Sequence, residues 1–368
     1  MDDNLIYRIA LASLRGINPT LAGQLTARTG SEEAFFRWSE RELSTAMGFG
    51  NKLFDNAYRR KLLEEAEKEY LFIERSGISP VFYTDSRYPR RLLQCDDAPA
   101  MLYTLGDCDL NEARFVAVVG TRHATVYGIG FTESLVEELG RKMKDPLVIV
   151  SGLAYGIDIA AHRAALKAGI PTVAVLAQGL NTIYPPAHRQ TAADIVRHGG
   201  MLVTDYRSID SIHKGNFLAR NRIVAGMSDA VVVAESAAKG GALVTARVAA
   251  GYSRDVFALP GRVSDRYSEG CNSLIAGNVA QLVTNADDII DSMRWPRKEA
   301  EGGQPSLFPE LTADEETVVD LLRNRGEASF SEISAKIEMP VARLMGMLVD
   351  LEFRNVIVQL PGGRYRLK

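Results

Sequence analysis

The sequence of 368 residues predicts an α/β protein whose centre is a doubly wound, mostly parallel β-sheet. In the central region, short apolar runs recur at regular intervals, and segments with helical apolar spacing separate most of them. These runs are continuously apolar, as in strands buried on both faces, and do not alternate with polar residues. A helical domain is predicted before this sheet and a winged helix after it.

Residues 1–75 are predicted to form the helical domain, a small bundle similar to SAM and helix-hairpin-helix domains. Leucine and isoleucine recur there at helical spacing, for example at Leu5 and Ile9, and proline is nearly absent. Two glycine turns, at 14–17 and 47–50, each precede a helix. In helix-hairpin-helix motifs, such turns let the free N–H groups of a helix bind phosphate, but plain turns in a bundle are the alternative.

The central domain is predicted at residues 76–295, and strands at 80–83 and 101–103 begin it. The strands predicted after these are 115–119, 147–150, 172–176, 201–203, 230–234, 256–259 and 281–283. The predicted helices between them are 131–143, 157–167, 220–226, 243–252 and 272–278. Strand and helix in turn imply right-handed crossovers, and ligands of such sheets bind at the carboxyl ends of the strands.

After Trp295 the composition becomes that of a linker, which we predict at residues 296–310. The remaining residues, 311–368, contain three helical patterns and then a pair of short strands at 356–360 and 364–367. Three helices followed by a two-stranded wing indicate a winged helix.

The composition limits the classes of function. With 43 Lys+Arg against 46 Asp+Glu, the net charge is -3, so a site for a polyanion must be a local patch. Cys95, Cys108 and Cys271 have neither zinc-site nor disulfide-framework spacing. Because there is no long apolar segment and no signal-like start, we expect a cytoplasmic protein that does not bind membranes.

The loop after the strand 115–119 is the first candidate for binding an anion. Gly120 permits a tight turn, Thr121 carries a hydroxyl, Arg122 carries a cation, and the next helix is expected near Gly128. The wide glycine spacing does not match a dinucleotide-binding fingerprint, and the chain has no P-loop motif.

The loop at 151–156 follows the next strand and begins with Ser151 and Gly152. Asp158 and His162 lie four residues apart on the helix after it, a spacing that would suit a metal or an acid and base pair. We favour the alternative that the two side chains hold the loop in place, because the sequence shows no further cluster of ligands.

A segment rich in bases surrounds Phe217. Lys214 precedes this ring, and Arg220, Asn221 and Arg222 follow it. Single-stranded nucleic acid needs cations for its phosphates and rings on which bases stack, and stacking contributes about 1–3 kcal/mol per base. The alternative is that Phe217 belongs to the core and Arg222 pairs with a neighbouring carboxylate.

The loop after the strand 230–234 contains Lys239, Gly240 and Gly241. Paired glycines let backbone N–H groups approach an anion at the start of a helix, and the lysine adds positive charge. We expect Lys239 to share one rim of the sheet with Arg122 and Arg220.

These loops lack the patterns of catalysis. They contain no nucleophile elbow, no paired carboxylates and no metal-ligand spacing. The sequence therefore predicts a binding surface without catalytic residues, metal or cofactor.

Taken together, these motifs resemble the DprA (Smf) family, the DNA-processing proteins of bacterial natural transformation. The resemblance covers nearly the whole chain and is carried by Tyr88-Pro89, Gly120-Thr121-Arg122, residues 151–158 with His162, Tyr184-Pro185, and residues 220–223, 239–245, 256–261 and 270–275. It implies an extended Rossmann fold that binds single-stranded DNA, forms a homodimer and helps to load the RecA recombinase. The family's phosphate-contacting arginine falls on Arg122, and its DNA-contact segment falls on Phe217–Arg222.

Two positions depart from the family pattern, and both are expected near the rim. His188 stands where asparagine is usual, and Gly241 stands where serine is usual. In the winged helix, the expected recognition helix at 341–352 has Arg343 as its only base. A helix for the DNA major groove should carry more positive charge, so we predict that this one packs against a partner subunit or its own core.

The sequence therefore predicts a non-enzymatic protein that protects incoming single-stranded DNA and loads RecA on it. A nucleotide-processing enzyme of the phosphoribohydrolase type is one alternative, because its sheet is similar, but residues 239–245 have no glutamate in reach. Transcriptional regulation by the winged helix is a second alternative.

Overall fold

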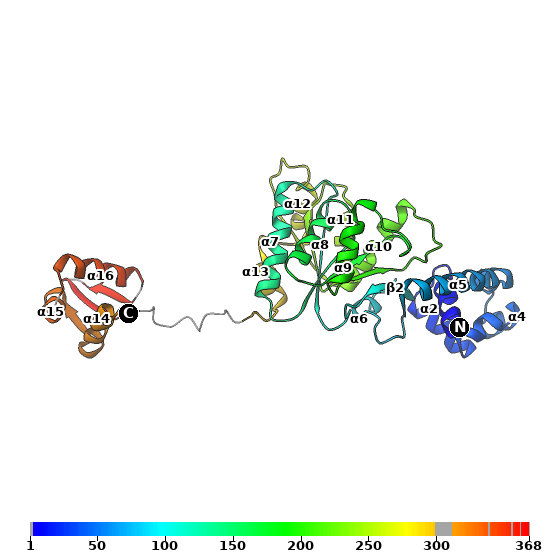
Figure 1. The fold of residues 1–368 in the computed structure, drawn as a ribbon, viewed down its shortest axis with the longest axis horizontal. Helices are drawn as coiled ribbons and strands as arrows, with labels where there is room; N and C mark the ends of the chain where they lie inside the picture. Colours follow the sequence, from blue (N-terminus) through cyan, green and yellow to red (C-terminus); the bar gives the residue numbers. More distant parts are fainter. Residues whose placement is uncertain (1–2, 299–310, 338, 355, 361, 368) are drawn as a thin grey trace. The chain divides into compact units, whose positions relative to one another are not determined.

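Two compact units, residues 1–298 and residues 299–368, make up the protein in a computed structural model (Figure 1). The structure describes all residues except 1–2, 299–310, 338, 355, 361 and 368. Beyond Lys298, the predicted linker at 296–310 therefore lies outside the described residues.

The first unit begins with a bundle of helices, as predicted. These are α1 (Asp3–Ala12), α2 (Pro19–Thr29), α3 (Glu32–Arg37), α4 (Glu40–Met47), the 3₁₀ helix η1 (Lys52–Phe54) and α5 (Asn56–Ser76). The apolar core of the bundle includes Phe82 and Tyr103 from the first two strands. The bundle thus packs directly against one edge of the sheet.

Side chains cap the N-termini of the helices that follow the two glycine turns. The Asn18 side chain accepts a hydrogen bond from the Leu21 N–H at 2.8 Å ahead of α2. After the second turn, Asn51 accepts one from the Leu53 N–H at 3.0 Å ahead of η1, and Asp55 accepts one from the Tyr58 N–H at 2.6 Å ahead of α5. These caps take N–H groups that a phosphate would need, and Asp55 is itself negative. The structure therefore favours plain turns over helix-hairpin-helix phosphate sites.

A nine-stranded sheet follows, with the order β1-β2-β6-β5-β4-β3-β7-β8-β9. Its strands are β1 (Ser79–Phe82), β2 (Met101–Gly106), β3 (Arg114–Gly120), β4 (Leu147–Ser151), β5 (Thr172–Val175), β6 (Met201–Thr204), β7 (Ala230–Glu235), β8 (Asp255–Ala258) and β9 (Gln281–Leu282). All pairs from β6 to β9 along the sheet are parallel, and β1 and β2 extend it antiparallel at the β6 edge. The prediction of a mostly parallel, doubly wound sheet is confirmed.

Helices cover both faces of this sheet. They are α6 (Arg90–Leu93), α7 (Val126–Lys142), α8 (Ile157–Lys167), the 3₁₀ helix η2 (Pro186–His188), α9 (Arg189–Arg197), α10 (Lys214–Met227), α11 (Gly241–Gly251), α12 (Glu269–Ala276) and α13 (Ala286–Met293). Along β3, Phe115 and Ala117 enter a core with α10, α11 and α12, whereas Val116 and Val118 enter a second core with α7, α8 and α13. Burial on both faces explains why the strands are continuously apolar in the sequence.

The direction of winding reverses between two neighbouring strands of the sheet. The chain proceeds from β3 through β4 and β5 to β6 on one side, and from β7 through β8 to β9 on the other. The carboxyl ends of β3 and β7 therefore lie side by side at the switch point, where open α/β sheets bind their ligands.

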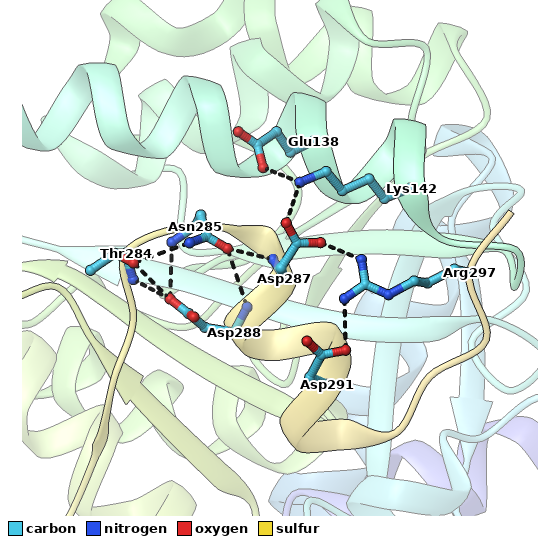
Figure 2. A network of polar contacts seen from close by, with 8 residues as sticks. All are labelled: Glu138, Lys142, Thr284, Asn285, Asp287, Asp288, Asp291 and Arg297. Carbon is cyan, nitrogen blue, oxygen red and sulfur yellow. Dashed lines mark hydrogen bonds and ion pairs between the residues drawn. The ribbon is translucent and has the colours of Figure 1, made fainter. Parts of the chain in front are cut away.

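An ion-pair network holds the last residues of the first unit (Figure 2). Lys142, at the end of α7, contacts Asp287 of α13 at 2.7 Å. Arg297 contacts Asp287 and also Asp291, the latter at 2.6 Å. The Lys298 N–H donates to the Lys142 carbonyl at 2.7 Å. The chain therefore leaves the first unit at the C-terminal end of α7.

The second unit has the predicted winged-helix fold. Its elements are α14 (Ala313–Arg325), β10 (Glu327–Ser329), α15 (Phe330–Lys336), α16 (Val341–Phe353), β11 (Ile357–Leu360) and β12 (Arg364–Leu367). The three strands pair in the order β10-β12-β11. Strand β10 is absent from the sequence prediction, because three residues are too few to show an apolar alternation.

Among the residues that the structure describes, no helix combines the length and the apolar character needed to cross a bilayer.

Candidate nucleic-acid interface

A cleft of about 560 Å³ lies at the carboxyl ends of β5, β4, β3 and β7, which are neighbours in that order. The first turns of α10 and α11 form its other walls. Its lining includes the predicted site residues Gly120, Thr121, Arg122, Phe217, Arg220, Asn221, Gly240 and Gly241. Residues from four loops and three helices, up to 126 positions apart in the chain (from 119 to 245), thus meet at one place.

The other predicted site residues lie beside the cleft and do not line it. Ser151 is buried, and its hydroxyl donates to the Val118 carbonyl at 2.7 Å, which joins β4 to β3. Gly152 lies against the guanidinium of Arg220, where a Cβ atom would come within 2.2 Å of a nitrogen. Lys239 is exposed, immediately before the lining residue Gly240.

The loop between β3 and α7 is held rigidly. The Thr121 N–H donates to the Glu235 carbonyl at 2.8 Å, and the Glu235 carboxylate accepts from the N–H and the hydroxyl of Thr125 at 2.8 and 2.5 Å. Glu235 is buried, and the Thr125 hydroxyl also accepts from the Gly128 N–H to cap α7. This glutamate is therefore occupied in shaping the loop.

Arg122 extends from that loop over an aromatic ring. Its guanidinium carbon lies 5.2 Å from the centre of the Phe217 ring, and Tyr184 meets the same ring edge-to-face at 5.6 Å. In the described part of the chain no carboxylate forms an ion pair with Arg122, which is exposed. A free guanidinium held against a half-buried ring offers charge to a phosphate and an apolar surface to a base.

Arg220 forms the floor of the cleft and is absent from its rim, which corrects the expectation that it shares the rim with Arg122. The residue is 4% exposed, and its guanidinium donates to the Val175 carbonyl. Its Nε is buried without a hydrogen-bond partner among the described residues. Burial lowers the pKa of Arg220, and the nearby Asp158 carboxylate opposes that effect.

Arg222 pairs with a neighbouring carboxylate, which was the alternative to DNA contact for this residue. It pairs with Asp205 at 2.5 Å and donates to the Asp97 carbonyl at 2.7 Å. These bonds fix α10 to the loops on its far side, away from the cleft.

Asp158 and His162 hold the floor of the cleft in place. The Asp158 carboxylate accepts from the Ala154 N–H at 3.4 Å, and Nδ1 of His162 lies 2.8 Å from the Thr172 hydroxyl. Burial is the main cause that lowers the pKa of His162 to about 3, so the ring is neutral at pH 7. Over the described ranges of the chain, no group of three or more His, Cys, Asp or Glu side chains is placed to hold a metal.

Helix α11 begins at the cleft without a side-chain cap. Gly240 is the N-cap residue, and in the described part of the chain no side chain caps this helix start. Gly241 opens the helix with no atom near the position that a Cβ would occupy. Open N–H groups and the positive end of the helix dipole suit an anion beside Arg122.

His188, the other departure from the family pattern, is buried and lies below the rim. One ring nitrogen lies 2.8 Å from the Leu153 carbonyl, and its ring meets Tyr155 edge-to-face at 4.9 Å. It therefore ties the loop after β5 to the loop after β4.

In the second unit, the expected recognition helix α16 partly packs on its own core. Leu344, Leu348 and Leu351 are buried there, and Arg343 pairs with Asp314 at 3.1 Å. Beside this buried face an apolar row stays exposed, comprising Val341, Met345, Val349 and Phe353. This face has little charge with which to bind DNA phosphates.

The predicted site set omits three residues beside Phe217 and Arg122. Lys214 is exposed and lines the cleft, as does Tyr184, and Tyr155 follows the lining residue Ala154. The basic stretch upstream of Phe217 is a sequence signal for Lys214. No sequence pattern shows that a tyrosine in a strand-end loop will stay exposed.

Family models and known proteins match most of the chain. Residues 79–294 match the family model for DNA recombination-mediator protein A, and residues 304–363 match that for the DprA winged helix domain. Protein Smf of Synechocystis is 30% identical and covers 98% of each chain. DNA processing protein DprA of Streptococcus pneumoniae is 40% identical over 56% of this chain and 71% of its own.

Two solved structures are similar in fold. The X-ray structure of DNA processing protein A from Streptococcus pneumoniae superposes with a TM-score of 0.63 at 32% identity, over 79% of this chain and 98% of that chain. A structure of DNA processing protein A from Helicobacter pylori, described for its single-stranded DNA binding mode, gives a TM-score of 0.52 at 32% identity, over 59% of this chain and 95% of that chain.

Proposed function

Because the chain belongs to the DprA (Smf) family of DNA recombination-mediator proteins, we propose that it binds single-stranded DNA in the cleft at the ends of β3, β4, β5 and β7. The observation that carries this proposal is the unpaired Arg122 guanidinium over the Phe217 ring, beside the uncapped start of α11. The single-stranded DNA binding mode described for the similar Helicobacter pylori protein supports it.

The predicted site residues enter this proposal in two roles. The residues proposed to contact DNA are Gly120, Thr121, Arg122, Phe217, Asn221, Gly240 and Gly241, which line the cleft, and Lys239, which is exposed beside it. Ser151, Gly152 and Arg220 shape the floor beneath them. Binding then depends on placed contacts and not on the net charge of -3.

We test the proposal by the salt dependence of binding. Replacing Arg122 or Lys239 with alanine should remove about one phosphate contact and lower the slope of log K against log salt by about 0.7, the single-strand value. The measurement is fluorescence anisotropy of a labelled oligothymidine over a salt series, with Arg141→Ala as a control. Arg141 is exposed at the far end of α7. Unchanged affinity of the Arg122 and Lys239 variants at low salt would show that DNA binds elsewhere.

The proposed role is delivery of the strand to the RecA recombinase by a homodimer of the central domain, without catalysis by this protein. The cleft supports the non-catalytic part, because Glu235 is engaged by Thr125 and His162 is buried and neutral. Light scattering of the pure protein measures the dimer, and RecA filament growth on protein-coated single strands measures delivery. Release of free base from AMP by the pure protein would instead support the phosphoribohydrolase alternative.

A further inference from the structure

Two exposed tyrosines, one lining the cleft and one following a lining residue, have no place in the proposed set of DNA contacts. Tyr155, after β4, is 47% exposed, and Tyr184, after β5, is 44% exposed. Over the described part of the chain, neither hydroxyl forms a hydrogen bond. Grouped exposed aromatic rings mark a binding surface, because folding alone would bury such rings or bond their hydroxyls.

Tyr127 gives a contrast within the same protein. It is 53% exposed, but its hydroxyl donates to the Pro260 carbonyl at 2.8 Å. That bond explains the position of Tyr127, whereas no polar contact explains those of Tyr155 and Tyr184.

Each of the two rings belongs to an aromatic pair. Tyr184 contacts the Phe217 ring at 5.6 Å, and Tyr155 contacts the ring of His188 at 4.9 Å, both edge-to-face. His188 lies four residues after Tyr184 in the same loop and is tied to Leu153 of the other loop. An edge-to-face contact leaves at least one face of each ring free for a further partner.

The two tyrosines and the cations Arg122 and Lys239 follow different strands of the sheet. The tyrosines follow β5 and β4, whereas Arg122 follows β3 and Lys239 follows β7. The loop that carries Tyr155 meets the loop that carries Arg122 at Gly156, where a Cβ would lie 2.1 Å from the Thr121 carbonyl oxygen. The backbone next to Tyr155 is therefore packed directly against the Arg122 loop.

We propose that Tyr155 and Tyr184 form a stacking platform for the bases of a bound single strand, while its phosphates follow Arg122, Lys239 and the start of α11. This inference rests on the proposed function and specifies which side of the site receives bases. Stacking on aromatic rings tolerates every base, so the platform adds affinity without adding sequence preference.

The experiment compares two oligonucleotides that differ only in their bases. An oligothymidine and an abasic strand of equal length carry the same phosphates, so the ratio of their affinities isolates the contribution of the bases. We expect Tyr155→Leu and Tyr184→Leu each to weaken oligothymidine binding about 5- to 150-fold. Both variants should bind the abasic strand within about 2-fold of wild type and keep its salt slope.

Tyr127→Leu is the matched control, a similarly exposed tyrosine outside the two aromatic pairs, and it should leave the ratio of the two affinities unchanged. If either platform variant keeps the wild-type ratio of the two affinities, the stacking inference is wrong. The proposed function still stands in that case, provided that wild type binds both strands. Equal losses for both strands in a variant also overturn the stacking inference, since they indicate a general structural defect. If wild-type protein binds neither strand at low salt, the proposed function itself fails.

Discussion

At the scale of single residues, burial divides the two arginines of the cleft into different tasks. Arg122 is exposed, and a phosphate in the cleft can reach it. Arg220 is 4% exposed below it, bonded to the Val175 carbonyl. A buried cation is unfavourable unless its surroundings compensate the charge, and the Asp158 carboxylate is the main favourable charge acting on Arg220.

This dependence predicts the effect of Arg220→Met. The variant leaves Asp158 buried without its cation, and the free energy of unfolding should fall by about 3 kcal/mol. In the double variant with Asp158→Asn, the total loss should be smaller than the sum of the single losses by about 1 kcal/mol or more. Urea unfolding of the four proteins measures both quantities. Strict additivity would mean that the two groups do not interact.

The buried histidine predicts a pH dependence of stability. The folded-state pKa of His162 is lowered from 6.5 to about 3, mainly by burial, with the charge of Arg220 as a lesser cause. Below pH 6.5 the unfolded chain therefore binds a proton that the native state excludes, so stability falls as the pH falls. Between pH 7.5 and 5.5 this one group should remove about 1.4 kcal/mol of the free energy of unfolding.

The variant His162→Gln isolates that contribution. The variant has no ring to protonate, so it should lack the contribution of His162 to the pH dependence of stability. The difference in unfolding free energy between wild type and variant should therefore narrow by about 1.4 kcal/mol between pH 7.5 and 5.5. Urea unfolding at pH 7.5, 6.5 and 5.5 tests this. Parallel pH profiles of the two proteins would show that the ring is protonated, or accessible, in the native state.

At the same scale, the sequence predicts which residues come together in the cleft but not how deeply each side chain is buried. The spacing of Arg122, Phe217 and Arg220 within strand-end loops and one helix is enough to bring them together. Their exposure depends on Gly152 and Val175, which are distant in the chain and surround the Arg220 guanidinium. No local pattern encodes that depth, so the rim position expected for Arg220 was wrong.

At the scale of elements, two glycines of the cleft differ in how closely other atoms approach them. Gly152 lies against the Arg220 guanidinium, whose place is fixed by its bond to Val175. Gly241 begins α11 with open space around it. The same substitution should therefore have opposite effects at these two positions.

We expect Gly152→Ala to destabilise the protein by about 1–3 kcal/mol, because its new methyl group overlaps the fixed guanidinium. Gly241→Ala should stabilise it by about 0.4–1 kcal/mol, because it restricts the unfolded chain without a clash. Thermal unfolding of both variants measures the two effects. Equal changes at both positions would mean that Arg220 moves freely.

Strands were predicted more reliably than helix ends. Buried parallel strands such as β3 and β7 are continuous apolar runs, which the sequence displays directly. Helix α10 starts at Lys214, six residues before the predicted start at residue 220. Most of its first two turns are exposed at the cleft, so they carry no apolar periodicity from which a start could be inferred.

At the scale of the whole molecule, all residues of the proposed DNA site lie in the unit of residues 1–298. In the other unit, Arg343 is the basic residue of helix α16, and it forms an ion pair with Asp314. We therefore expect a chain of residues 1–298 to bind oligothymidine with the same affinity and salt slope as the full chain. Anisotropy on both proteins measures this, and a lower slope for the shorter chain would assign phosphate contacts to the winged helix.

The network of Lys142, Asp287, Asp291 and Arg297 also determines how the first unit carries a mechanical load (Figure 2). Tension along the chain from residue 299 onward would act first on Lys298 and Arg297, and so on the last turn of α7. Helix α7 begins just after the Arg122 loop, so this load enters at the end of the helix that is remote from the cleft. Surface ion pairs are each worth about 0–1 kcal/mol and weaken with salt. The force needed to pull these residues away from α7 should therefore fall as the salt concentration rises, as the affinity of the proposed DNA site should.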